Sequence, residues 1–430
     1  MVRTTLPIDP ATATIYAEGW QSWTPTRWYS AAESPERPVD DNHRRMGYGV
    51  NAVGDSGFAG LGLLAVRPDP GEPLHTFSTT RPDDVPTIRA NVHDDAITVE
   101  SVGGVEQQRI AVQDDTAALS AWAIRFARRN RLPQPRAAPT VWCSWYQFFT
   151  EVRESDIDRN LAAIDACELA VDVVQIDDGY QSEIGDWLVP SGRFPDLAAT
   201  IGRIRAAGRR AGIWLAPFLV GERATLARDH PDWLLPGADP GRNWGQRLHV
   251  LDVAHPAVVD YWRRVFEHFM ALGIDYFKLD FLYAGALTGE RRGEAIARYR
   301  GGLGLVRDIV GADAYLAGSG APTLASAGLV DAMRVSPDTA PYAEAPSGDA
   351  SSPGLGNAIR NGAARQWQNH VLWTNDPDCL LARPEVAERA RWASHLNAVD
   401  GLRSVSDDIE GLDDWGLSAT RSYLAGPARP

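Results

Sequence analysis

The sequence of 430 residues contains a single lysine, Lys278, although lysine and arginine together number 42. Acidic residues number 56, and the formal net charge is −14. Nucleic acids and anionic membranes both require basic surfaces, so this balance excludes either as an expected partner. Lys278 lies two residues before Asp280 in a largely apolar stretch. The pair is therefore the first candidate for a functional site.

Cysteine is also scarce, and long apolar runs are missing. The three cysteines, Cys143, Cys167 and Cys379, form no CxxC or Cys/His spacing that would indicate zinc. No apolar stretch approaches the roughly 20 residues that cross a bilayer. The first 20 residues contain no apolar signal-peptide core. We therefore expect a cytoplasmic protein with reduced thiols, and the sequence leaves its oligomeric state open.

The chain divides into two parts of different character. Residues 1–135 hold short β-like runs separated by turns of Asp, Gly and Pro, without long helical periodicity, which predicts a small β-rich N-terminal domain. Residues 127–139 are rich in proline and arginine and resemble a linker with no long amphipathic tract on either side. In residues 136–430, strand-like runs alternate with helical patterns, for example helices over 154–166 and 256–273.

This alternation predicts a (β/α)₈ TIM barrel with a short C-terminal extension. The eight expected strands span residues 141–146, 171–177, 211–218, 274–281, 314–319, 332–336, 371–376 and 401–406. A doubly wound open sheet is the structural alternative, but it would need a glycine-rich phosphate loop after an early strand, and none appears.

Active sites of such barrels lie at the C-terminal ends of the strands. The side chains expected there include carboxylates, tryptophans, the lysine and one arginine, but no histidine cluster. Carboxylates, lysine and arginine hydrogen-bond sugar hydroxyls, and tryptophan stacks on sugar rings. Two carboxylates also suffice for glycoside hydrolysis, one as nucleophile or base and one as acid.

Each candidate also has a purely structural interpretation. The stretch from Asp177 to Gly179 is a turn sequence by composition, and Asp338 follows a proline where it would cap a loop. Lys278 and Asp280 share one face of a strand and would form a structural ion pair, a costly device for stability when buried.

Several motifs together resemble the α-galactosidases, or melibiases, of glycoside hydrolase family 36 in clan D. The motifs that carry this resemblance are GWQSW (19–23), WCSWYQFFTEV (142–152), QIDDGYQ (175–181), RFPD (193–196), GIWLAPF (212–218), HPDWLL (230–235), DYFKLDFLYAGAL (275–287), MRVSPDT (333–339) and WTNDPDCLL (373–381). They extend over nearly the whole chain.

The resemblance implies a retaining, exo-acting α-glycosidase, with α-galactosidase as the leading expectation, that acts on α-linked galactosides or related oligosaccharides. The strand ends offer acids without the His or Cys ligands of a transition-metal site, so we expect no metal and no cofactor. The resemblance implies that Asp280 of the KxD motif is the nucleophile and that Asp338 is the acid/base, with their carboxyl groups about 5–5.5 Å apart. The candidate substrate-binding residues are Asp177, Asp178, Lys278, Arg334, Trp145, Trp214, Trp187, Ser319 and Asp376.

Lys278 is expected to keep Asp280 ionised through its nearby positive charge and to donate to ring oxygens, which the bulkier arginine fork would not do in the same space.

Two departures from the family pattern leave the sugar specificity open. Phe281 and Leu282 follow the nucleophile where relatives carry Asn-Cys or Met-Asn, and AGSGAP (317–322) replaces a Cys-Ser-Gly-Gly stretch. The alternatives are another α-glycosidase, such as an α-N-acetylgalactosaminidase, or a transglycosylase. A non-catalytic carbohydrate-binding barrel is a further alternative, and so is a metal-dependent aldolase or isomerase, which would need His or Glu ligands at the rim.

Overall fold

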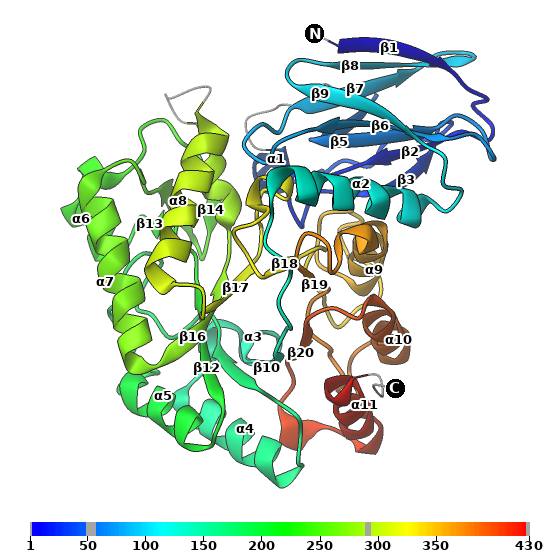
Figure 1. The fold of residues 1–430 in the computed structure, drawn as a ribbon. Coiled ribbons are helices and arrows are strands. Elements are labelled where there is room, and N and C mark those ends of the chain that lie inside the picture. Colours follow the sequence, from blue (N-terminus) through cyan, green and yellow to red (C-terminus); the bar gives the residue numbers. More distant parts are fainter. Residues whose placement is uncertain (1, 49–56, 289–293, 427–430) are drawn as a thin grey trace.

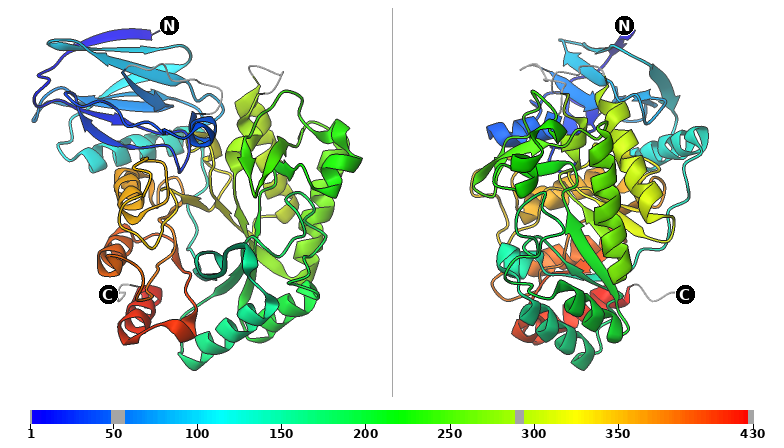
Figure 2. Two further views of the ribbon diagram at one scale, coloured as in Figure 1. Left: turned by 180° about the vertical axis from the view of Figure 1, so that it is seen from behind. Right: turned by 90° about the vertical axis from the view of Figure 1, so that its left-hand side faces the viewer.

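The structure, a computed structural model, describes residues 2–48, 57–288 and 294–426. A β-rich N-terminal part lies against one side of a larger part in which helices surround a parallel sheet (Figure 1). The two parts keep this side-by-side arrangement when the molecule is turned (Figure 2).

The N-terminal part contains two antiparallel sheets. The first sheet consists, in spatial order, of β1 (Val2–Pro7), β8 (Ala96–Ser101), β7 (Thr87–Val92) and β4 (Phe58–Leu61). The second consists of β3 (Arg27–Ser30), β2 (Thr14–Ala17), β5 (Leu63–Arg67), β6 (Leu74–Thr79) and β9 (Val105–Ile110). The expected β-rich character of this part is confirmed.

Both faces of the second sheet are buried at its inner strands β5 and β6, because alternate side chains there contribute to two different cores. On β5, Leu64 and Val66 pack toward the first sheet and form a small core between the two sheets. Leu63 and Ala65 point the other way and join the large core shared with the barrel. Because successive side chains of β5 point to opposite faces and both faces are apolar cores, its sequence is a continuous apolar run and not an alternation of apolar and polar residues.

The helix α2 (Asp115–Asn130) packs on the face of the second sheet that is turned toward the barrel (Figure 1). The expectation of no long amphipathic tract next to the 127–139 segment is therefore wrong. Asp114 caps the helix by accepting a hydrogen bond from the Ala117 N–H, and Arg131 ends it in the left-handed region. Trp122 anchors it, with Nε1 donating to Ser78 Oγ at 2.8 Å. Two of its buried core residues, Ala118 and Ala123, are alanines, which blur the apolar stripe in the sequence.

The second part is the expected barrel. Its eight strands are β10 (Thr140–Cys143), β11 (Val173–Ile176), β12 (Arg210–Leu215), β16 (Ile274–Leu279), β17 (Tyr315–Gly318), β18 (Ala332–Arg334), β19 (Thr374–Asp376) and β20 (Arg403–Val405). They pair in parallel in this chain order, and β20 pairs with β10. A parallel bridge between Leu380 and Val405 brings the chain after β19 beside β20.

Each expected barrel strand is present, with shorter bounds. The first strand, which was expected to reach residue 146, ends at Cys143. Trp145 and Tyr146 instead begin the short helix α3 (Trp145–Phe148). Trp142, on β10, is buried in the core, whereas Trp145 lies on this helix.

Helices cover the outside of the barrel, and the two named from sequence lie where they were expected. These two are α4 (Glu154–Ala166) and α7 (Pro256–Leu272). The other helices are α1 (Asp41–Tyr48) in the N-terminal part and, in the barrel part, α5 (Leu197–Ala206), α6 (Thr225–Asp229), α8 (Ala295–Val310), α9 (Leu355–Ala364), α10 (Arg389–Val399) and α11 (Asp414–Ala425). In α7, Pro256 occupies the first turn and Gly273 ends the helix at φ 95°, in the left-handed conformation that glycine adopts without strain.

A small antiparallel sheet is inserted between β12 and α7. It consists of β13 (Leu219–Gly221), β15 (Gln246–Val250) and β14 (Arg242–Asn243). The turn between β14 and β15 carries Trp244, whose φ of 51° places it in the left-handed region. This insertion was not predicted, and it supplies one wall of the site described below.

A buried ion pair holds the N-terminal part on the barrel. Arg365 Nε lies 2.8 Å from Glu18 Oε1, and the two side chains are 1% and 0% exposed. The remaining guanidinium nitrogens of Arg365 donate to the carbonyl oxygens of Val335 and Gln21 at 2.9 and 3.0 Å. The charge of Arg365 is thus compensated by the N-terminal part alone, since Glu18 follows β2 directly.

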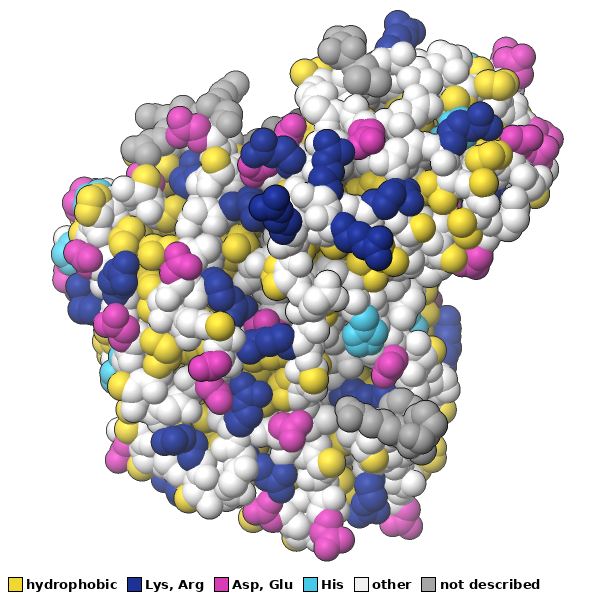
Figure 3. Space-filling view, in the orientation of Figure 1, with side chains coloured by type: hydrophobic (Ala, Val, Ile, Leu, Met, Phe, Trp, Pro, Cys, Tyr) yellow, Lys and Arg dark blue, Asp and Glu magenta, His cyan; other side chains and the backbone are white. Residues whose placement is uncertain are grey.

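The outer surface carries charges of both signs. One face shows basic and acidic side chains interspersed, with basic ones gathered over α2 (Figure 3), where Arg128 and Arg129 occupy the last turn. Among the described residues, none of the helices combines the length and apolarity needed to cross a membrane.

The buried pair generates a prediction about stability. Replacing Glu18 with Gln should lower the free energy of unfolding by about 3–5 kcal/mol, because it leaves the Arg365 charge buried without a counter-charge. The matched control is Glu100→Gln, which removes one partner of the exposed Arg3–Glu100 pair and should change stability by less than about 1 kcal/mol. Urea unfolding followed by tryptophan fluorescence measures both. Similar small losses in the two variants would contradict the role assigned to the buried pair.

Candidate active site

A cavity of about 220 Å³ opens at the C-terminal ends of the barrel strands. Seven of the residues expected from sequence line it together: Trp145, Asp177, Asp178, Trp214, Lys278, Asp280 and Asp338. They come from four strands or the segments that follow them and from α3. Strand alternation explains why Lys278 and Asp280 share this cavity, since residues two apart point to the same side of a strand.

Asp280 directly follows β16 and is held by two N–H donors. The Trp214 Nε1–H donates to Oδ2 at 3.1 Å, and the Phe281 backbone N–H donates to Oδ1 at 2.7 Å. Phe281 itself has a φ of 52°, a left-handed conformation that is uncommon for a bulky residue. Such local strain is typical of functional sites.

The ion-pair partner of Lys278 differs from the one expected. Its Nζ lies 2.9 Å from Asp177 Oδ2, so the direct contact is with Asp177 rather than with Asp280. Burial alone would lower the pKa of Lys278, but the Asp177 carboxylate raises it well above its usual value. Lys278 therefore stays charged, and Asp280 contributes to this only as a more distant carboxylate.

Asp177 has little remaining capacity for a ligand. Besides Lys278, its Oδ2 accepts from Gln175 Nε2 at 2.6 Å and from the Cys143 thiol at 3.3 Å. Its Oδ1 accepts from the Asp178 N–H at 2.9 Å. A carboxylate has about four acceptor sites, so Asp177 chiefly fixes the position of Lys278.

Asp178 is held differently. Gln181 Nε2 donates to its Oδ1 at 2.5 Å, and the Trp244 Nε1–H donates to its Oδ2 at 2.7 Å. Burial raises the pKa of Asp178 to about 6, against the effect of these hydrogen bonds. The stretch is also a turn, as its composition indicates, and Gly179 makes it possible. Its φ is 124°, and a Cβ there would lie 2.7 Å from the Thr150 carbonyl oxygen.

Asp338 belongs to a cluster of three carboxylates around one arginine. Arg334 contacts Asp338 at 3.1 Å, Asp376 at 3.2 Å and Asp378 at 2.9 Å, and its side chain is only 3% exposed. The Tyr146 hydroxyl donates to Asp378. Burial raises the pKa of Asp338 to about 6, Arg334 opposes this rise, and the negative charges of Asp378 and Asp280 reinforce it.

Four of the expected site residues do not line the cavity. Arg334 and Asp376 lie behind Asp338, as the cluster shows. Trp187 packs edge-on against Trp214 with ring centroids 5.8 Å apart, so it supports a cavity wall. Ser319 is 2% exposed, and its Oγ has no hydrogen-bond partner among the described residues. For these four, the strand-end argument identified the correct end of the barrel but not the side-chain direction.

Six further residues line the cavity and were not proposed from the sequence: Trp23, Tyr146, Thr150, Asn243, Trp244 and Phe281. Trp23 comes from the N-terminal part and packs against Phe281 with ring centroids 5.2 Å apart. The GWQSW motif contained it, but nothing local indicates that residue 23 reaches the barrel. Trp244 lies in the inserted sheet, where a lone aromatic residue in a turn gave no signal.

The acids of this site are not arranged as a metal centre. Within the described parts of the chain, no three His, Cys, Asp or Glu side chains are placed to hold a metal ion. The cations in contact with the acids are instead Lys278 and Arg334.

Comparisons with known proteins show the family to which the chain belongs. The profile of the Melibiase family matches residues 114–298, which include Asp177, Asp178 and Asp280. The α-galactosidase TtGalA from Thermus thermophilus, solved with stachyose, superposes with a TM-score of 0.85 at 32% identity. The alignment covers 99% of this chain and 92% of that one. The chain belongs to the glycoside hydrolase family 36 α-galactosidases.

Two further α-galactosidases match this chain over a shorter stretch or at lower identity. α-Galactosidase 1 from Pediococcus pentosaceus is 30% identical over 185 residues, which are 38% of this chain and 24% of that protein. The chain thus matches a minor share of the length of the curated relatives. The structure of the family 36 enzyme AgaA from Geobacillus stearothermophilus superposes with a TM-score of 0.67 at 17% identity, covering 98% of this chain and 62% of that one, which shows the shared fold.

The cluster of three carboxylates around Arg334 generates a prediction about the pKa of Asp338. In Asp378→Asn, the pKa of Asp338 should fall below about 6, because a neighbouring negative charge is lost and Arg334 turns more fully toward Asp338. Carbon-13 NMR of labelled aspartate carboxyls measures this pKa, and a melting curve checks that the variant is folded. The control Asp229→Asn alters an exposed pair with Arg228 and should leave Asp338 unchanged. A raised or unchanged pKa in Asp378→Asn would contradict the assignment.

Proposed function

We propose that this protein is a retaining, exo-acting α-glycosidase whose preferred substrates are α-galactosides. The observation that carries the proposal is that Asp280 and Asp338 line one small cavity in contrasting environments. Asp280 accepts two N–H donors and is oriented as an acceptor, whereas the pKa of Asp338 is raised to about 6 by burial. Two carboxyl groups in such different environments are typical of a nucleophile and an acid that act on the same substrate.

In the proposed reaction, Asp280 attacks the anomeric carbon while the Asp338 carboxyl gives its proton to the leaving oxygen. The glycosidic C–O bond breaks, and a glycosyl ester with Asp280 forms. Asp338, now a carboxylate, removes a proton from water as the water attacks the anomeric carbon and releases Asp280. Two inversions give net retention, and the starting protonation states are restored.

The charge around the cavity supports this chemistry. Six carboxylates line the cavity or lie behind it, whereas Lys278 and Arg334 are the two cations in contact with them. The transition state of glycoside hydrolysis resembles an oxocarbenium ion, and a preorganised excess of negative charge stabilises it. Trp145 and Trp214 supply aromatic surface in the same cavity, which suits the apolar C–H faces of a sugar ring.

The choice of galactose and of the non-reducing end has separate support. TtGalA has been solved with p-nitrophenyl α-D-galactopyranoside and with stachyose, and its chain corresponds to this one over nearly its full length. The cavity volume of about 220 Å³ suits a single terminal sugar rather than the interior of a chain. An α-N-acetylgalactosaminidase or a transglycosylase would use the same two carboxylates, and the products distinguish them.

The experiment that tests this function follows the products by proton NMR. With p-nitrophenyl α-galactoside we expect free galactose to appear first as the α-anomer and then to mutarotate, because two displacements at one carbon retain configuration. The matching α-N-acetylgalactosaminide should react far more slowly, and added sugar acceptors will reveal transglycosylation. The β-anomer appearing first would contradict retention, and an inert protein would contradict the proposed activity.

Two variants test the separate roles of the carboxylates. Asp280→Ala should lose turnover, and azide should restore part of it by forming a β-galactosyl azide, because a small anion fills the space of the missing carboxylate. Asp338→Ala should retain activity on nitrophenyl galactosides and lose about 10²–10⁴-fold on alkyl galactosides, whose leaving oxygen needs a proton. Equal losses on both substrates in Asp338→Ala would rule out its role as the acid, provided that the melting temperature is unchanged.

A further inference from the structure

Trp244 occupies a turn position that is unfavourable for a bulky side chain. It is the first residue of the two-residue turn between β14 and β15, in which Asn243 pairs with Gln246. Trp244 and Gly245 have φ values of 51° and 66°, so both central residues are left-handed, as in a type I′ hairpin turn. Such turns favour Asn or Gly at the first position. A bulky residue stays in this strained conformation only where the surrounding structure fixes it, which is common at functional sites.

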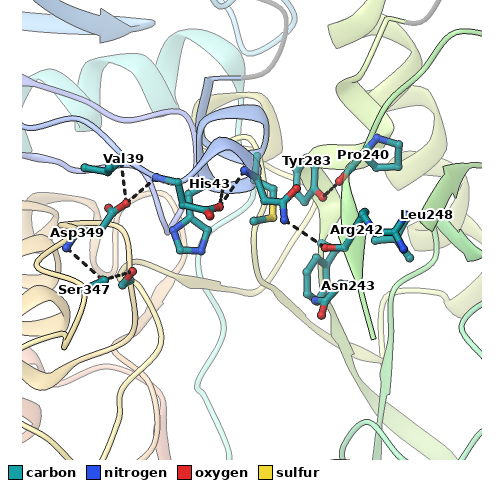
Figure 4. Close-up of a pocket in the computed structure, with 14 residues that line it drawn as sticks. Val39, His43, Pro240, Arg242, Asn243, Leu248, Tyr283, Ser347 and Asp349 are labelled. Carbon is teal, nitrogen blue, oxygen red and sulfur yellow. Dashed lines mark hydrogen bonds between the residues drawn. The ribbon is translucent and has the colours of Figure 1, made fainter. Parts of the chain in front are cut away.

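The turn is fastened to two barrel segments, one after β11 and one after β16. Gln246 Nε2 donates to Oε2 of Glu183, in the segment after β11, at 2.9 Å. The hydroxyl of Tyr283, in the segment after β16, donates to the carbonyl oxygen of Pro240, just before β14, at 3.0 Å (Figure 4). The position of Trp244 is therefore set relative to both segments, and each of them begins with acids of the active site.

The indole N–H of Trp244 leaves Asp178 able to bind a ligand. It donates to Asp178 Oδ2 at 2.7 Å, and Gln181 Nε2 donates to Oδ1 at 2.5 Å. These two contacts occupy about half of the roughly four acceptor sites of a carboxylate. Asp178 lines the active-site cavity and, unlike the saturated Asp177, keeps acceptor sites for the hydroxyl groups of a sugar when it is ionised.

The ring of Trp244 packs against both residues that orient Asp280. Its centroid lies 6.3 Å from that of Trp214 and 5.1 Å from that of Phe281. The Trp214 Nε1–H and the Phe281 backbone N–H are the two donors to the Asp280 carboxylate. One side chain of the inserted sheet thus contacts an acid that faces the cavity and the two groups that hold the proposed nucleophile.

We propose that Trp244 is a positioning residue of the active site: its N–H keeps Asp178 available as a charged acceptor for the sugar, and its ring holds the two donors of Asp280 in place. The inference rests on the proposed α-galactosidase activity and gives the inserted sheet a role in it. Acid conditions should then limit catalysis through Asp178, because a protonated carboxyl no longer accepts on both oxygens.

Several groups act on the charge of Asp178. Burial raises its pKa, the donors Gln181 and Trp244 lower it, and the balance sets it at about 6. Among the described residues, the charged and titratable groups that line the active-site cavity with it are Tyr146, Asp177, Lys278, Asp280 and Asp338. Tyr180 also lies near it, and an adjoining hollow of about 370 Å³ adds Glu183, Arg193 and Arg223. Trp244→Phe leaves all of these groups in place and removes only the N–H donor.

The first test measures the pKa of Asp178 directly. Carbon-13 NMR of labelled aspartate carboxyls should show it rising by about one unit in Trp244→Phe, because the charged form loses a donor. The matched control is Trp415→Phe, since Trp415 is an exposed indole on α11, and it should leave this pKa unchanged. The measurement does not depend on turnover.

The second test is the pH dependence of kcat/KM with p-nitrophenyl α-galactoside. Trp244→Phe should be about tenfold less active than the wild type near pH 5 and within about twofold of it near pH 8, because its Asp178 loses the proton at a higher pH. The titration of Asp280 and Asp338 is common to both proteins and cancels in their ratio. Trp415→Phe should follow the wild type at every pH.

Trp244→Ala tests the contacts of the ring. It should show the same shift in pH dependence and, in addition, a loss in kcat of about tenfold at every pH, because Trp214 and Phe281 lose the surface against which they pack. A melting curve checks that each variant is folded.

The outcomes separate this inference from the proposed function. A wild-type protein that does not hydrolyse α-galactosides would overturn the proposed function and, with it, the inference. An active wild type with an unchanged Asp178 pKa in Trp244→Phe would overturn the inference alone. Equal, pH-independent losses in Trp244→Phe and Trp244→Ala would indicate a purely structural role and would also overturn it.

Discussion

Two buried cations, Lys278 and Arg334, make it possible for the carboxylates of this site to lie together. Lys278 compensates Asp177, and Arg334 compensates the cluster that contains Asp338. Without them, the buried acids would take up protons or separate, because uncompensated charges in a protein interior are strongly unfavourable. Lys278 is the only lysine of the chain, and its compact ammonium fits beside the Asp177 carboxylate, which accepts from several donors at once. The planar guanidinium of an arginine would fit this place poorly.

The same network assigns different properties to acids of one chemical type. Asp177 is saturated with donors, whereas Asp178 and Asp338 have a raised pKa because burial outweighs their favourable contacts. Asp280 receives its two N–H donors from an aromatic side chain and from a strained backbone. The environment therefore decides which carboxyl is suited to accept, to donate a proton or to position a neighbour. The N-terminal part takes part in this environment through Trp23, so the buried Glu18–Arg365 pair that docks it also supports the site.

The barrel was predictable because its signals are local. Each strand is a short apolar run followed by a turn and a helical pattern, and all eight runs fall on observed strands. The N-terminal part was less predictable. On β5 both faces are buried, which removes the alternation that marks a strand, and α2 buries small alanines that weaken its apolar stripe. In both cases the partner that explains the pattern lies elsewhere in the chain, outside any local window.

The sequence by itself determined that Lys278 and Asp280 share a face, since the period of a strand is two residues, and that the acids following β11, β16 and β18 lie at one end of the barrel. Only the tertiary structure decided which side chains of the site contact each other. Lys278 contacts Asp177, which is 101 residues away, and Trp244 reaches Asp178 from an inserted turn. These contacts depend on how distant segments pack, and no local periodicity encodes the direction in which a side chain points once its strand has ended.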